Sequence, residues 1–175
     1  MVWDRLLCAI DQFESGKSAL DFVAGVAATN DASVRVLHLR EISRMARVLP
    51  LETPIEAEEL VREAVMELGR SGVPAEGRSG SALEDQVARK IVDEALRWEC
   101  QAIVLGSRRV RGIARLSGRG VRERILRMSS LPVLVAPAAQ SNGIYWPPRF
   151  RSGGERDATV SGTRAPHGAR THSDS

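Results

Sequence analysis

The feature that most constrains the fold of this chain is a series of five short aliphatic segments separated by stretches with helical periodicity. The first, LLCAI, is continuously apolar, which is typical of a strand buried on both faces. Strands that alternate with helices indicate βαβ units. We therefore predict a single three-layer α/β domain whose five-stranded, mostly parallel sheet is doubly wound, with helices on both faces. The expected strands are residues 6–10, 33–40, 72–80, 102–107 and 131–137.

Capping signals and apolar periodicity predict the helices between these strands. The segment 15–30 places small and aliphatic residues on one helical face. Thr53, Pro54 and Glu56 form a capping box with proline at the first helical position. A second capping box, from Ser81 to Glu84, is expected to open a helix whose apolar stripe runs from Leu83 to Leu96. The last helix is expected over residues 121–128, and Pro74 predicts that the poorly apolar third strand lies at a sheet edge.

Composition narrows the class of protein. Aromatic residues make up only 4% of the chain, so the core must consist of aliphatic side chains. No run approaches the roughly 20 apolar residues that span a bilayer, and the N-terminus lacks the pattern of a secretion signal. The two cysteines, Cys8 and Cys100, belong to no ligand motif, which favours a reduced, cytoplasmic protein without a metal cofactor.

The character of the chain changes after Pro137. Residues 138–175 are rich in Ser, Gly, Arg, Pro and Thr and show no apolar periodicity. Such a segment cannot bury enough surface to offset its ordering entropy, so we predict a disordered tail after a domain of residues 1–137. The histidines of the tail, His167 and His172, show no metal-ligand spacing.

Two features fall at the carboxyl ends of the predicted strands, where open α/β sheets bind ligands. Asp11 follows the first strand, and a loop rich in glycine and arginine follows the fourth. Glycine allows close approach to a phosphate, and the helix expected after Gly120 offers free amides to an anion. A solvated basic loop is the alternative reading. The loop and the following helix contain eight arginines: Arg108, Arg109, Arg111, Arg115, Arg119, Arg122, Arg124 and Arg127.

Several segments resemble the universal stress protein family. They are LLCAID, VLHL, ARKIVDEALRWECQAIVLGSR, GIARL and LRMSSLPVLVAP, and the resemblance covers residues 4–137. It implies a regulatory, non-enzymatic module that in some members binds ATP or a related adenine nucleotide. Binding members carry the motif glycine, two residues, glycine, nine residues, glycine and then serine or threonine.

The phosphate half of this motif is altered here. Gly106 matches its first glycine, whereas Arg109 and Arg119 replace the next two, and Gly120 replaces the hydroxyl residue. Arg108, inside the same loop, joins them as a candidate phosphate contact. Arg109 either fills the pocket and excludes nucleotide or clasps a phosphate with two hydrogen bonds.

The nucleoside half of the implied site is retained. Asp11 matches the aspartate that meets the nucleoside, although an aspartate at the end of a strand also caps the turn into a following helix. The positions that match those lining adenine and sugar are Ile10, Leu39, Leu105 and Val121. His38 is expected to be a structural residue at a strand end. No nucleophile, base and orienting residue can be assembled, so we expect no catalysis.

Three function classes remain at this point. The first is a nucleotide-binding regulator. The second is a ligand-free interaction module that forms a homodimer through its last strand, Leu131–Pro137, with Val133 and Val135 at the interface; the resemblance implies this pairing, and an unbroken aliphatic edge strand suits it. The third, a nucleic-acid binder, is disfavoured because basic and acidic residues nearly balance over residues 1–137.

Overall fold

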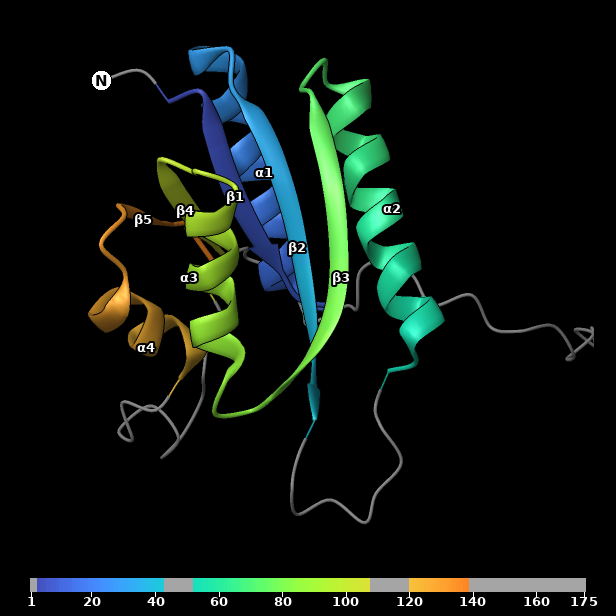
Figure 1. Ribbon diagram of the computed structural model, residues 1–175. Coiled ribbons are helices and arrows are strands. Elements are labelled where there is room, and N and C mark those ends of the chain that lie inside the picture. The colour runs from blue at the N-terminus through green and yellow to red at the C-terminus, as the bar shows by residue number, and fades with distance from the viewer. Residues whose placement is uncertain (1–2, 43–51, 108–119, 139–175) are drawn as a thin grey trace, which may run out of the picture.

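The computed structural model describes residues 3–42, 52–107 and 120–138 of the chain (Figure 1). The predicted tail therefore lies, from residue 139 onward, outside the described residues. The elements follow the order β1 (Arg5–Ile10), α1 (Glu14–Asn30), β2 (Ser33–Ile42), α2 (Pro54–Arg70), β3 (Ala75–Leu83), α3 (Val87–Arg97), β4 (Ala102–Leu105), α4 (Val121–Met128) and β5 (Val133–Val135).

The five strands form one sheet in the order β3-β2-β1-β4-β5, and every neighbouring pair is parallel. This arrangement confirms the predicted doubly wound α/β fold. The chain adds β2 and β3 on one side of β1 and then returns to add β4 and β5 on the other side. The direction of winding therefore reverses between β1 and β4.

Alternation along β1 explains why both faces of the sheet are covered. Leu6, Cys8 and Ile10 point into an apolar cluster with α1 and α2, whereas Leu7 points into a second cluster with α3 and α4. Figure 1 shows α3 and α4 on the side of the sheet nearest the viewer, with α1 behind it. A strand that is buried on both faces must be apolar throughout, which is the pattern that identified LLCAI.

The capping box at the start of α2 is present as predicted. The Thr53 hydroxyl accepts a hydrogen bond from the Glu56 amide at 3.2 Å, and the Glu56 carboxylate accepts one from the Thr53 amide at 2.7 Å. Pro54 occupies the first helical position. These contacts fix the point at which the chain enters α2, directly after Glu52.

The second predicted capping box is wrong. Ser81 and Leu83 belong to β3, and α3 begins only at Val87, with no side-chain cap. The reason is the long ladder between β2 and β3, which pairs nine residues and ends at Ile42 and Leu83. A continuous row of backbone hydrogen bonds outweighs one local cap. As predicted, β3 lies at a sheet edge, but it is displaced by three residues from the expected range 72–80 and follows Pro74 rather than containing it.

Three further expectations differ from the structure. The fourth and fifth strands are shorter than predicted, because β4 ends at Leu105 and offers β5 only three partners, Ile103 to Leu105. Val133 and Val135 are the first and last residues of β5. His38 lies inside β2 rather than at a strand end, because pairing with β3 extends β2 to Ile42.

Within the described ranges, no helix combines the length and the apolar character needed to cross a bilayer.

Replacing Thr53 with alanine tests the anchor of α2. The Thr53→Ala variant loses the hydroxyl that accepts from the Glu56 amide, so we expect its free energy of unfolding to fall by about 1 kcal/mol. Urea denaturation measures the change. Thr29→Ala is the matched control, because the Thr29 hydroxyl bonds the Gly25 carbonyl inside α1 and caps nothing. Equal effects of the two substitutions would contradict this role of the capping box.

Candidate functional site

The candidate site lies where the winding of the sheet reverses. Ala9 of β1 pairs with Leu105 of β4, so Ile10, Asp11 and Gly106 follow at the same, carboxyl edge of the sheet. Strands that leave in opposite directions at such a switch point open a crevice between their loops, which is where doubly wound proteins bind ligands. The sequence therefore placed Asp11 and Gly106 correctly at one edge.

The Asp11 carboxylate organises the turn from β1 into α1. One oxygen, Oδ1, accepts from the amides of Phe13 at 3.0 Å and Gly16 at 2.9 Å. The other, Oδ2, accepts from the Ser15 hydroxyl at 2.6 Å. The capping role considered for Asp11 is thus observed. The Asp11 side chain is half-buried at this edge of the sheet.

Gly106 brings the exit of β4 into contact with the same turn. A Cβ atom at this position would overlap the carbonyl oxygen of Ser15, so only glycine lets the two backbones approach so closely. Ser15 is therefore held between Asp11, through its side chain, and Gly106, through its backbone. This contact joins the loops that follow β1 and β4 into one structural unit.

The four positions expected to line the nucleoside do not all lie together. Leu105 is buried in the cluster with α3 and α4, and Leu39 and Val121 pack against that cluster. Ile10 is buried on the opposite face, with α1 and α2. The structure thus brings three of these side chains to one face at the carboxyl edge, while Ile10 reaches that edge only through its backbone.

The start of α4 already carries a negative charge. Gly120 is the N-cap and makes no side-chain capping bond, and the Glu123 carboxylate folds back so closely that a Cβ at Gly120 would overlap it. Hydrogen bonds from the Arg122 guanidinium, followed by a backbone hydrogen bond, lower the pKa of Glu123 below its usual value. Glu123 is therefore a carboxylate at neutral pH, next to the amides that would otherwise attract a phosphate. Arg108, Arg109 and Arg119 lie outside the described residues.

One feature of this edge escaped the sequence prediction. His38 is 4% exposed, and its ring lies between the backbone carbonyl of Ile10 and the carboxylate of Glu52. Glu52 is fourteen residues away along the chain. Periodicity predicts that a strand and a helix are present, but it does not predict contacts between residues far apart in the sequence. The pair of His38 and Glu52 therefore has no local sequence signal.

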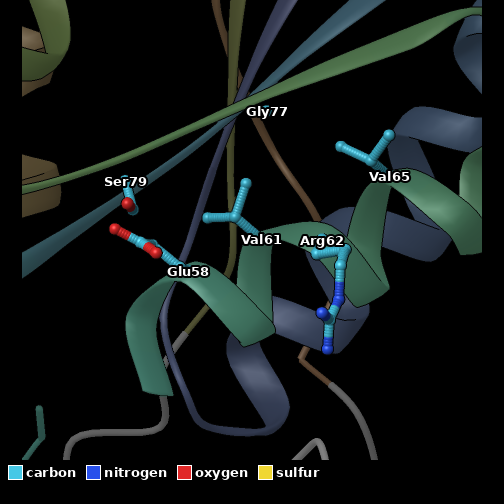
Figure 2. Close-up of a pocket in the computed structure, with 6 residues that line it drawn as sticks. All are labelled: Glu58, Val61, Arg62, Val65, Gly77 and Ser79. Carbon is cyan, nitrogen blue, oxygen red and sulfur yellow. The ribbon is translucent and has the colours of Figure 1, made fainter. Parts of the chain in front are cut away.

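A separate hollow lies between α2 and the edge strand β3 (Figure 2). Figure 2 shows Ser79 of β3 facing Glu58 of α2, with Val61 below the strand. The hollow contains none of the residues predicted for the site. Its lining consists of Glu58, Val61, Arg62, Val65, Gly77 and Ser79.

Among the residues that the structure describes, no group of three or more His, Cys, Asp and Glu side chains is arranged to hold a metal ion.

Comparison with known proteins agrees with the observed fold. The family model of the universal stress protein family matches residues 3–137. No curated protein matches the chain. A universal stress protein solved in complex with cAMP is 22% identical, with a TM-score of 0.63 over 79% of this chain and 100% of that one.

Two further structures show the same fold. A universal stress protein family member from Burkholderia pseudomallei is 24% identical, with a TM-score of 0.59 over 77% of this chain and 96% of that one. The universal stress protein of Archaeoglobus fulgidus in complex with dAMP is 24% identical, with a TM-score of 0.56 over 78% of this chain and 100% of that one. At these identities the structures establish a common fold, and the family model covers most of the sequence. The chain belongs to the universal stress protein family.

Proposed function

We propose that this protein is a regulatory module that binds an adenine nucleotide at the carboxyl ends of β1 and β4. The observation that carries the proposal is the contact of Gly106 with Ser15, which joins the β4 exit to the turn held by Asp11. This unit lies at the switch point of the sheet, where the fold favours a ligand crevice. Two structurally similar family members were solved with cAMP and dAMP.

The proposed contacts follow from the positions of the side chains. Leu39, Leu105 and Val121 supply an apolar surface for the base and sugar from the α3 and α4 side of the sheet. Asp11 and the backbone of Ile10 border the nucleoside, and the candidate phosphate contacts are Gly106, Arg108, Arg109, Arg119 and Gly120. Because the Glu123 carboxylate, paired with Arg122, already occupies the start of α4 at Gly120, we expect this helix end to add little affinity for the outer phosphates, so that adenosine monophosphates bind at least as tightly as ATP.

The proposed module binds and signals rather than catalyses. The buried histidine nearest the site, His38, engages both ring nitrogens in hydrogen bonds, so it is not free to act as a general base. Cys8 and Cys100 are free and buried, and burial raises the pKa of both thiols, that of Cys100 to about 12. Such thiols are poor nucleophiles at neutral pH. Unpaired cysteines also suit the reducing cytoplasm, where we place the protein.

Equilibrium dialysis with radiolabelled AMP, cAMP and ATP tests the proposed binding. We expect the full chain to retain the monophosphates at millimolar concentration, and Asp11→Ala to weaken their binding about tenfold or more. Asp21→Ala is the matched control, because Asp21 is an exposed carboxylate of α1 paired with Lys17. Circular dichroism verifies that each variant is folded. Absence of retention for all three nucleotides with the folded wild-type chain would reject this function.

A second candidate function is supported by the open edge of the sheet at β5. Val133 and Leu134 are half-buried, and Val135 is 37% exposed. The neighbouring helix α4 exposes Leu126 and Met128. Among the described strands, β5 pairs only with β4, and an apolar edge strand of this kind suits pairing with a second copy. We propose a homodimer through β5, which would serve as an interaction module with or without nucleotide.

Lysine substitutions at both ends of β5 test the dimer. Since two buried ammonium groups per protomer would oppose pairing, Val133→Lys/Val135→Lys should convert a dimer into a folded monomer. Sedimentation equilibrium gives the molar mass. Ile55→Lys on α2 is the control, because Ile55 is the most exposed large apolar side chain described and lies away from β5. A wild-type chain that sediments as a monomer, or a double variant that keeps the dimer mass, would refute the proposed interface.

A further inference from the structure

The ring of His38 connects three segments at the carboxyl edge of the sheet. From β2, its Nδ1 lies 2.9 Å from the Ile10 carbonyl oxygen at the end of β1. Its Nε2 lies 2.8 and 3.0 Å from the two carboxylate oxygens of Glu52, the residue before the N-cap of α2. His38 and Glu52 are both nearly excluded from solvent. The pair therefore ties the exit of β1 to the start of α2 through one side chain.

The partners of this ring determine its protonation state. A backbone carbonyl and a carboxylate are both acceptors, so only the doubly protonated imidazolium can donate to each of them. Burial lowers the pKa of His38, but the hydrogen bonds to Glu52 and Ile10 and the negative charges of Glu52 and Asp11 outweigh burial. The pKa of His38 consequently lies above its ordinary value of 6.5.

Among the described residues, the elements around His38 carry the following other charged and polar groups. Arg40 of β2 donates from Nη1 to the Glu52 carbonyl oxygen at 3.1 Å, which helps to hold Glu52 in place. The β3 residue in register with His38 is the uncharged Ser79, and α1 presents the uncharged Ser15 at this edge. Glu58 and Arg62 of α2 lie in the hollow beside Ser79 (Figure 2).

We propose that His38 and Glu52 form a pH-sensitive clamp that positions the Ile10–Asp11 corner of the nucleotide site. The clamp is closed when His38 is protonated and loosens when it is neutral. This inference rests on the proposed nucleotide-binding function and assigns to it a regulator, the pH around the protein. His38 acts as a positioning residue, because it reaches the site through the Ile10 carbonyl.

Loss of the proton weakens the site for two reasons. A neutral ring has one N–H group, so either the Ile10 carbonyl or the Glu52 carboxylate then faces a lone pair. In addition, the buried Glu52 carboxylate loses the cation that it contacts at 2.8 Å, since Arg40 bonds the backbone carbonyl of Glu52. Since the folded pKa is raised, the contact is fully present below pH 6.5 and is lost as the pH rises through the folded value.

A nuclear magnetic resonance titration of the full chain tests the clamp without any ligand. The ring signals of His38, assigned with a His38→Asn variant, should titrate together with the amides of Phe13 and Gly16. These amides report on the corner because both donate to Asp11. Glu52→Gln should lower the midpoint of the ring and of both amides by about one pH unit or more. Glu59→Gln, an exposed carboxyl change on α2, should leave the midpoints unchanged.

The affinity for AMP, measured on the same samples from about pH 6 to 9, supplies the functional readout. We expect the affinity to fall roughly three- to tenfold as His38 loses its proton, the range for one lost hydrogen bond. In the Glu52→Gln variant, the AMP affinity should fall at a lower pH, because the His38 ring then loses its proton at a lower pH. If Glu52→Gln does not fold, the titration midpoints of the wild-type ring, of the two amides and of the AMP affinity still show whether the three change together.

The outcomes separate the clamp from the proposed function. Amides of Phe13 and Gly16 that stay constant while His38 titrates would overturn the clamp, and so would an AMP affinity independent of pH. Absence of AMP binding at every pH would overturn the nucleotide-binding function instead, and the amide titration would still decide whether His38 controls this corner.

Discussion

The close approach of Gly106 to Ser15 is the contact on which the proposed site depends. Parallel pairing brings the ends of β1 and β4 to one edge of the sheet, but pairing alone leaves their loops independent. The missing side chain at Gly106 lets the β4 exit contact the first turn of α1, where Asp11 holds the Ser15 hydroxyl. One backbone contact and one carboxylate thus join two strand ends into one structural unit, at which we propose that the ligand binds.

The other interactions at this edge act on the same unit. The capping box of Thr53 and Glu56 fixes the start of α2, which places the preceding Glu52 against His38. His38 in turn bonds the carbonyl of Ile10, the residue before Asp11. Glu52 and His38 therefore connect the start of α2 to the end of β1, beside the proposed nucleoside contact Asp11.

The fold could be predicted from the sequence because most of its signals are local. The apolar run of β1, the amphipathic α2 and the capping box at Thr53 each follow from residues a few positions apart. The capping box expected at Ser81 failed because its residues pair with β2, and that pairing is a long-range interaction. Local propensity and tertiary pairing conflicted there, and the ladder determined the outcome.

The candidate site was predictable only in part, for the same reason. Asp11 and Gly106 follow strands, so the topology of a doubly wound sheet places both at one edge. The pairing of His38 with Glu52 depends on how the chain returns from β2 to α2, which residue spacing does not specify. Nor did the sequence indicate that Ile10 faces the opposite side of the sheet from Leu39 and Leu105.

A crystal structure of the full chain grown with AMP would show whether a nucleotide binds where β1 and β4 end. We predict density for one adenosine monophosphate at the carboxyl edge between β1 and β4, in contact with Asp11 and the backbone of Gly106. Density for AMP only in the hollow between α2 and β3, or an unoccupied β1–β4 edge at saturating AMP, would contradict it.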